Sequence, residues 1–144
     1  MRGIRIAKIL LIDDDVDFTE ANRLVLTGLG HTVSCAATAA EAEALIGNSE
    51  LDVIVLDVMM ESMTAGFELA TRIHRANTRV PVIMVSGIRE MVNRQLGFEP
   101  GESLPVLKFV DKPVTPRALA AHIEAVIRAS TSMESEDGKD DSTC

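Results

Sequence analysis

The chain has 144 residues, of which 47% are hydrophobic, 25% are charged and only 3% are aromatic, and its net charge is −8. That length is enough for one domain with one core, and the shortage of aromatic residues predicts a core of aliphatic side chains. The acidic balance, without a basic stripe, argues against direct binding to nucleic acid, because neutralising phosphates requires clustered lysines and arginines.

The cysteines and the N-terminus predict a cytoplasmic protein. Cys35 lies in an apolar segment and Cys144 is the last residue, a pattern that fits a reduced protein better than a disulfide scaffold. The apolar stretch near the N-terminus is short and runs directly into Asp13–Asp15. It is therefore neither a signal peptide nor a membrane span.

Apolar runs of strand length recur five times along the chain. They cover residues 9–12, 32–36, 53–56, 82–85 and 106–110. Four of the five are continuous rather than alternating, which is typical of strands buried on both faces of a parallel sheet.

Helical patterns alternate with these runs. Phe18, Ala21, Val25 and Leu29 are predicted to form the buried face of the first helix. Later helices are expected around residues 38–46, 67–77, 88–96 and 116–130. The spacing of Thr38 and Glu41 predicts a capping box, and Thr115-Pro116 predicts a cap followed by proline at the first helical position. His31, His74 and His122 lack metal-ligand spacing and are expected at the surface or on helix flanks.

These elements predict an α/β domain in which five strands alternate with five helices that cover both sheet faces. We expect the domain to span residues 1–130. Residues 131–144 hold five acids and one lysine and are predicted to form a disordered acidic tail.

Reactive side chains follow the predicted strands. In an open parallel sheet, sites form beyond the carboxyl ends of the strands. The first strand runs into Asp13–Asp15, the third ends at Asp57, the fourth at Ser86 and the fifth before Lys112. Converging carboxylates repel one another unless a cation joins them, and Mg²⁺ prefers oxygen ligands. Asp57 as nucleophile, Lys112 as cation and Ser86 as donor then suit phosphoryl transfer.

These segments together resemble the response-regulator receiver domain of two-component signalling. The segments are residues 9–15, 53–60, 82–86 and 109–113, and the resemblance extends over about residues 7–129. It implies a stand-alone receiver with a flavodoxin-like, doubly wound, five-stranded parallel sheet in the order 2-1-3-4-5. It also implies transfer of a phosphoryl group from a histidine kinase or histidine phosphotransfer protein in a Mg²⁺-dependent reaction.

The resemblance implies a role for each matching residue. Asp57 is the expected phosphoacceptor, and Asp13, Asp14, Asp57 and the backbone carbonyl of Met59 are the expected metal ligands. Lys112 is expected to contact the phosphoryl oxygens, and its bond to Pro113 is expected to be cis. Ser86 and Phe109 are the expected switch residues: Ser86 moves towards the phosphoryl group and Phe109 turns inward.

Signalling through a downstream protein partner, with phosphorylation-dependent homodimerisation as an option, follows from the resemblance. The chain is not expected to be an enzyme beyond its own phosphotransfer and self-dephosphorylation. Three features depart from the family pattern: Glu61 where proline is frequent, Gly87 where alanine is frequent, and a long Pro- and Gly-containing connection at residues 97–105.

Two alternatives remain open. The segment Leu10–Val16 also resembles the first motif of haloacid-dehalogenase-type phosphatases, which would make Asp13 the nucleophile and Asp15 the general acid. That interpretation leaves Asp57 without a role. The second alternative is a degenerate receiver, a binding module that takes no phosphate, although all the reactive positions are occupied. Taken singly, each strand-end residue also fits a plain structural role as a helix cap or turn residue.

Overall fold

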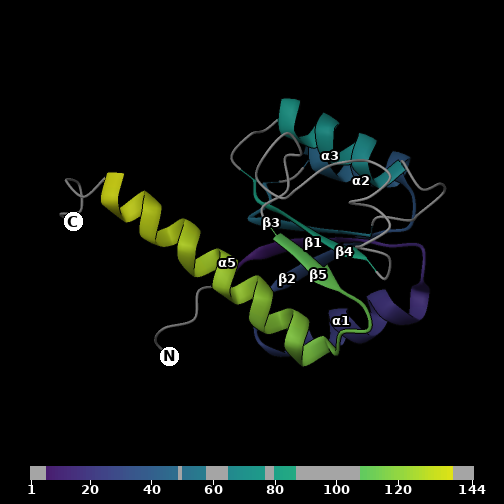
Figure 1. The fold of residues 1–144 in the computed structure, drawn as a ribbon, viewed down its shortest axis with the longest axis horizontal. Coiled ribbons are helices and arrows are strands. Elements are labelled where there is room, and N and C mark those ends of the chain that lie inside the picture. Colours follow the sequence, from purple (N-terminus) through teal and green to yellow (C-terminus); the bar gives the residue numbers. More distant parts are fainter. Residues whose placement is uncertain (1–5, 49, 58–64, 77–79, 87–107, 138–144) are drawn as a thin grey trace.

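A single parallel sheet organises the chain (Figure 1). The structure, a computed structural model, describes residues 6–48, 50–57, 65–76, 80–86 and 108–137. The five strands lie in the order β2-β1-β3-β4-β5, which confirms the predicted α/β fold class. Their bounds are β1 (Lys8–Ile12), β2 (Thr32–Ala36), β3 (Val53–Asp57), β4 (Val82–Ser86) and β5 (Lys108–Asp111).

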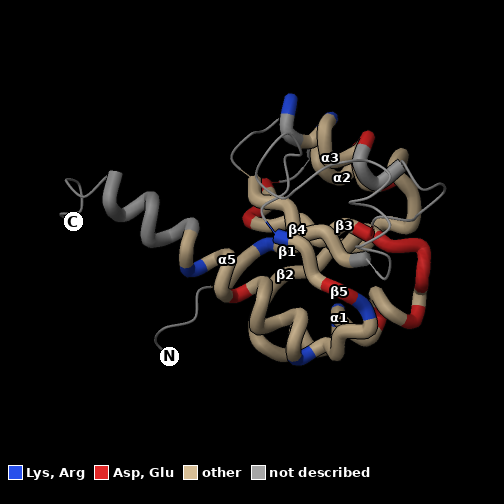
Figure 2. The backbone as a smooth tube through the Cα atoms, in the orientation of Figure 1, with Lys and Arg blue, Asp and Glu red and all other residues tan. Residues whose placement is uncertain are grey.

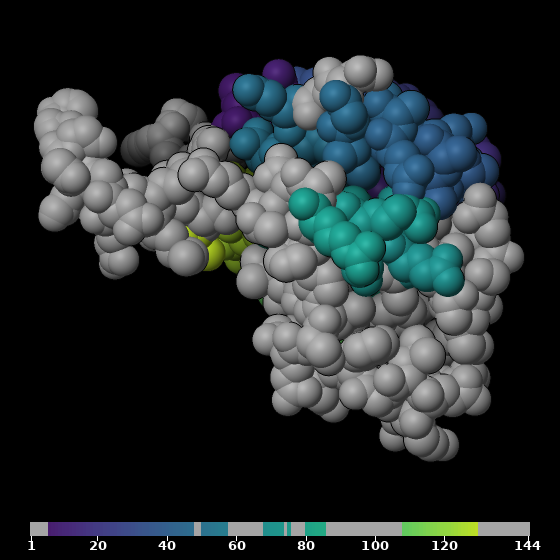
Figure 3. All heavy atoms as spheres, turned by 90° about the horizontal axis from the view of Figure 1, so that it is seen from above, coloured from purple at the N-terminus to yellow at the C-terminus, as the bar shows by residue number. Residues whose placement is uncertain are grey.

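Helices cover both faces of this sheet. Among the described residues there are four: α1 (Val16–Gly28), α2 (Ala39–Asn48), α3 (Ala65–Ala76) and α5 (Pro116–Asp137). The helix predicted at residues 88–96 lies outside the described residues. Helices α1 and α5 lie on one face, and α2 and α3 lie on the other (Figure 1). Figure 3 shows α2 and α3 next to each other at the surface.

Side-chain alternation along the strands divides the core into two clusters. In β1, Leu10 and Ile12 face α2 and α3, whereas Ile9 and Leu11 face α1 and α5. All four are at most 1% exposed. Burial on both faces explains why the strand sequences are continuous apolar runs, and it removes from water the apolar area that stabilises the fold.

The predicted helix starts are confirmed. The Glu41 backbone N–H donates to the Thr38 hydroxyl at 3.2 Å, and the Glu41 carboxylate accepts from the Ala37 N–H at 2.8 Å. At α5 the Ala118 N–H donates to the Thr115 hydroxyl at 3.1 Å. The two bonds to threonine hydroxyls satisfy backbone donors that the first helical turn leaves free.

The predicted buried face of α1 needs correction. The residues fully buried in this helix are Thr19, Asn22 and Leu26, while Ala21 and Leu29 of the predicted face are exposed. Two of the buried residues are polar, but each bonds within the helix: the Thr19 hydroxyl donates to the Val16 carbonyl and the Asn22 amide to the Phe18 carbonyl. Apolar periodicity alone misses a buried face that includes polar residues whose donors bond to the backbone of their own helix.

His31 is not at the surface, contrary to expectation. Its side chain is fully buried, and it lies just before β2. The Ala7 N–H donates to His31 Nδ1 at 3.0 Å, which requires Nδ1 to carry no proton. His31 Nε2 then donates to Glu124 of α5 at 3.1 Å. The ring therefore joins the starts of β1 and β2 to the middle of α5.

Helix α5 runs past residue 130, where the domain was predicted to end, and that domain boundary stays a prediction. Helix α5 continues to Asp137, away from the sheet (Figure 1). No glycine or proline interrupts the sequence between Arg117 and Gly138, so nothing in the chain stops the helix earlier. Residues 138–144 lie outside the described residues. No helix in the described ranges has the length and apolar character needed to cross a bilayer.

Candidate phosphoacceptor site

The carboxyl ends of the strands bring the predicted acidic residues and Lys112 together. Asp13 and Asp14 follow β1, Asp57 ends β3 and Lys112 follows β5. Because all five strands run parallel, these ends meet at one edge of the sheet. In Figure 2 the acidic run after β1 and the acid–base pair after β5 lie on the same side of the molecule.

Three carboxylates form the negative part of the site. Oxygens of Asp13, Asp14 and Asp57 all lie within 4.8 Å of one another. Asp13 is 4% exposed and Asp57 is 7% exposed, whereas Asp14 is exposed. The Asp13 N–H donates to the Ala36 carbonyl at 3.0 Å, which extends the pairing of β1 with β2 by one residue and fixes where the acidic run leaves the sheet.

Lys112 supplies the positive charge. Its Nζ lies 3.1 Å from Asp13 Oδ2 and 3.7 Å from Asp57 Oδ1, and its side chain is 26% exposed. The first distance is a charge-assisted hydrogen bond, and the second is an ion pair without a close hydrogen bond. The Lys112-Pro113 bond is cis, as expected.

The turn after β1 holds Asp13 in place. The Asp15 N–H donates to Asp13 Oδ1 at 2.9 Å, and Asp15 Oδ1 accepts from the Phe18 N–H at 3.2 Å. Asp15 is thus the N-cap of α1, the plain structural role that a residue at the end of a strand can take. Its carboxylate points into the helix start, which disfavours its use as the general acid of a phosphatase.

The arrangement suits a hard divalent cation. Three carboxylates face one ammonium among the described side chains, so the site has excess negative charge, and two of the carboxylates are buried where such an excess is costly. Carboxylate oxygens are the ligands that Mg²⁺ prefers. Asp13, Asp14 and Asp57 would hold the ion; the predicted fourth ligand, the Met59 carbonyl, lies outside the described residues.

The predicted switch residues are described only in part. Ser86 ends β4 and pairs in register with Asp111 of β5, but its side chain is outside the described set. Phe109 is 8% exposed and belongs to the core cluster beneath α2 and α3. The family departures predicted at Glu61, Gly87 and residues 97–105 also lie outside the described residues.

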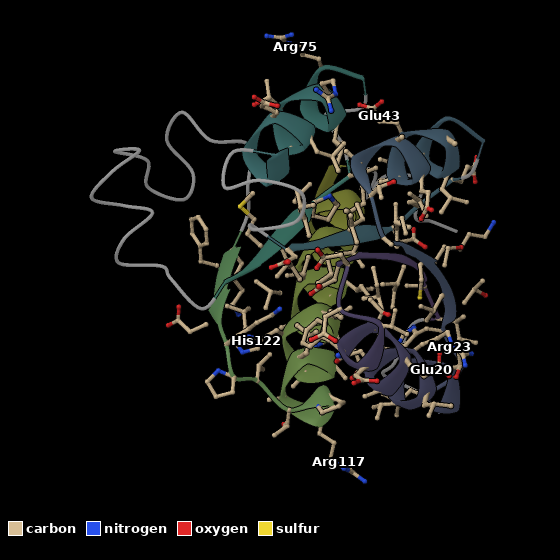
Figure 4. The ribbon with its side chains drawn as sticks, turned by 90° about the vertical axis from the view of Figure 1, so that its right-hand side faces the viewer. Glu20, Arg23, Glu43, Arg75, Arg117 and His122 are labelled. Carbon is tan, nitrogen blue, oxygen red and sulfur yellow. The ribbon has the colours of Figure 1, made fainter. Side chains whose placement is uncertain are left out.

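Two titratable groups away from the site have shifted pKa values. Partial burial, and secondarily the charge of Lys108, lowers the pKa of His122 on α5. Partial burial raises the pKa of the Cys35 thiol, and Cys35 is a free, exposed cysteine on β2. On the surface of α1, Glu20 and Arg23 lie side by side and form an ion pair (Figure 4).

The sequence did not reveal one contact of the site. Phe18, predicted only as part of the buried face of α1, places the centroid of its ring 4.4 Å from Lys112 Nζ. The two residues are far apart in the sequence, and no motif links an aromatic residue three positions after a helix cap to a lysine beyond the last strand. Only the strand order places them together.

Comparison with known proteins agrees with this geometry. The model of the response regulator receiver domain family matches residues 9–124. The transcriptional regulatory protein AfsQ1 of Streptomyces coelicolor is 37% identical over 120 residues, which cover 83% of this chain and 51% of that protein. The phosphate regulon transcriptional regulatory protein PhoB of Pseudomonas aeruginosa is 33% identical over 130 residues, which cover 89% of this chain and 55% of PhoB.

Solved structures show the same architecture. A CheY-like receiver domain protein from Methanospirillum hungatei matches with a TM-score of 0.74 and 26% identity, over 90% of this chain and 99% of that one. The chemotaxis response regulator CheY4 of Vibrio cholerae matches with a TM-score of 0.73 and 25% identity, over 85% and 99%. The present chain spans about half the length of the curated relatives it matches. It belongs to the response regulator receiver domain family of two-component systems.

Proposed function

We propose that this chain is a phosphoacceptor response regulator that takes a phosphoryl group onto Asp57 from a histidine kinase or histidine phosphotransfer protein. The observation that supports the proposal most strongly is the position of Asp57. Its carboxylate is buried at the end of β3, clustered with Asp13 and Asp14, and 3.7 Å from the Lys112 ammonium. A buried aspartate with no chemical task would not need that much surrounding charge.

The transfer step uses the residues of the site directly. A carboxylate oxygen of Asp57 attacks the phosphorus of the donor phosphohistidine and forms a new O–P bond. The P–N bond breaks, and its electron pair stays on the imidazole nitrogen, which takes up a proton. Lys112 places positive charge beside the attacked group, where it stabilises the phosphoryl oxygens. A bound Mg²⁺ supplies further positive charge for those oxygens.

Signalling would follow from the added charge. A phosphoryl group brings about 1.5 to 2 negative charges near neutral pH. In this proposal Ser86 moves to donate a hydrogen bond to it, and Phe109, buried on the next strand, repacks with that movement. A changed surface near β5 and α5 is then available to a downstream protein or to a second copy of the chain.

The wider setting is also part of the proposal. We infer a cytoplasmic protein without enzymatic turnover beyond its own phosphotransfer and dephosphorylation. The two curated relatives above are transcriptional regulators. This chain's net charge of −8 argues against direct DNA binding, so its output is proposed to pass through a protein partner.

Labelling with acetyl phosphate tests the proposal. The wild-type chain should incorporate phosphate when Mg²⁺ is present and lose that ability in EDTA, and Asp57→Asn should reduce incorporation to background. Asp52→Asn is a matched control, because Asp52 precedes the same strand at the opposite end of the sheet. Full labelling of Asp57→Asn would overturn the assignment, as would labelling of wild-type protein that ignores Mg²⁺ removal.

A further inference from the structure

The ring of Phe18 is the part of the site that phosphotransfer, as described so far, does not use. Lys112 Nζ lies over this ring at 4.4 Å from its centroid, a distance at which the ring's negative face attracts a cation. The ring itself is half-buried and packs against the core cluster beneath α1 and α5. It therefore offers the ammonium a fixed surface and not a mobile one.

Phe18 and Lys112 belong to a ring of four residues, with Asp13 and Asp15, in which each residue contacts the next. Lys112 bonds to Asp13 Oδ2, and Asp13 Oδ1 accepts from the Asp15 N–H. Asp15 in turn accepts from the Phe18 N–H, and the Phe18 ring contacts Lys112. The N-cap of α1 thus fixes the backbone of Phe18 relative to Asp13, so the ring and the carboxylate hold the ammonium from two sides.

The ring matters most when a divalent cation is present. Lysine carries a flexible four-carbon stem, so its ammonium stays in place only where partners hold it. Its closest partner, Asp13, is also one of the three carboxylates suited to hold Mg²⁺. A cation that shares this carboxylate weakens its attraction for Lys112, but it does not compete for an uncharged ring.

We propose that Phe18 is a positioning residue for phosphotransfer: its ring face holds the Lys112 ammonium beside Asp57, including when a divalent cation shares the Asp13 carboxylate. The reaction in this statement rests on the proposed function, whereas the contact itself does not. The ligand class that benefits is a phosphoryl group, whose oxygens need the ammonium at a fixed place.

Plain packing is the alternative, since Phe18 is also part of the core. Three variants separate the two roles. Phe18→Leu keeps an apolar side chain but removes the ring face, and Phe18→Tyr keeps the ring. Val25→Ala removes apolar contact from the same helix and the same cluster without touching Lys112.

The first measurement needs no phosphodonor. In a ¹³C–¹H spectrum, the ε-methylene protons of Lys112, assigned by their absence in Lys112→Gln, should lie upfield of those of the other lysines because of the ring current. The shift should persist when Mg²⁺ is added, remain in Phe18→Tyr and vanish in Phe18→Leu. An unshifted signal in the wild type, or a shift that disappears with Mg²⁺, would overturn the proposal.

The second measurement is the rate of labelling by acetyl phosphate at saturating Mg²⁺. Phe18→Leu should slow it about fivefold, in line with the strength of a cation–π contact, while Phe18→Tyr and Val25→Ala stay within about twofold of the wild type. Equal slowing by Phe18→Leu and Val25→Ala would assign Phe18 to packing alone. A wild-type chain that takes no label would contradict the proposed function instead, and the ring-current shift would still decide whether Phe18 holds Lys112.

Discussion

Buried polar groups lie at both ends of the sheet, and they are built in opposite ways. At the amino end, His31 is fully buried and both ring nitrogens are paired, one with the Ala7 N–H and one with Glu124. At the carboxyl end, Asp13, Asp14 and Asp57 crowd together around Lys112. In the first group both ring nitrogens have hydrogen-bond partners, so no further ligand is needed. The second group has excess negative charge.

The two groups have different roles: the His31 network stabilises the fold, and the acidic cluster serves phosphotransfer. A closed buried network holds its elements together, and removing one member leaves the others unpaired. A crowded cluster of like charges is destabilising by itself and is balanced by an added cation. We therefore expect variants at the amino end of the sheet to lose stability and keep phosphotransfer. Variants at the carboxyl end of the sheet should lose phosphotransfer and keep their stability.

The largest expected effect is that of His31→Ala. The variant leaves the buried Ala7 N–H without its partner and releases Glu124, so the free energy of unfolding should fall by about 2 to 4 kcal/mol in urea titrations. Labelling of the folded protein should remain within twofold. The control His122→Ala, at a half-buried position on the same helix as Glu124, should change stability by less than about 1 kcal/mol. Equal losses for both variants would contradict the closed network.

Mg²⁺ should stabilise the protein only by binding the acidic cluster at the carboxyl end of the sheet. At a concentration 100 times its Kd, a ligand that binds only the native state adds about 2.7 kcal/mol to the free energy of unfolding. Asp14→Asn, with a Kd about tenfold weaker, should gain only about 1.4 kcal/mol at that concentration. His31→Ala should gain as much as the wild type. An equal gain for wild type and Asp14→Asn would show that the ion binds elsewhere.

Asp57→Asn should stabilise the cation-free protein. Removing one of three crowded carboxylates relieves repulsion, and we expect a gain of about 1 kcal/mol in EDTA. Asp52→Asn is the matched control at the other end of β3, where Asp52 accepts a hydrogen bond from the Lys8 N–H at 2.8 Å. That variant should lose about 1 kcal/mol. A loss of stability in Asp57→Asn would show that the acidic cluster is already balanced.

The smallest expected effect concerns His122. Because its pKa is lowered in the folded protein, the unfolded chain takes up this proton at a higher pH than the folded chain does. Its contribution to stability is therefore present above the ordinary value of 6.5 and is lost as the pH falls below it. In an NMR titration, Lys108→Gln should raise the pKa of His122. An unchanged pKa would remove Lys108 as a cause.

The sequence predicted the elements that repeat simple patterns. Apolar runs of strand length located the five strands, and Thr38 and Thr115 marked helix starts through local hydrogen bonds. The acidic residues and Lys112 were predictable as one site because parallel strands end at one edge. Local rules and strand direction are enough for these features.

Contacts between distant segments were not predictable in the same way. The burial of His31 depends on its contacts with Glu124 and with the start of β1. The ring of Phe18 contacts Lys112 only because β1 and β5 belong to the same sheet. The buried face of α1 was misplaced because Thr19 and Asn22 are polar by composition but bond within their own helix. Pairings of this kind come from the assembled fold and not from local sequence.

Mapping the phosphorylated residue tests the central claim most directly. The wild-type chain, labelled with acetyl phosphate and Mg²⁺, would be reduced with borohydride, which converts an aspartyl phosphate to homoserine, and then analysed by peptide mass spectrometry. Asp57 is buried and lies beside Asp13 and Asp14, and this position predicts a single homoserine at residue 57. Conversion at Asp13 would instead support phosphatase-type chemistry, and it would contradict the assignment of Asp57 as the phosphoacceptor.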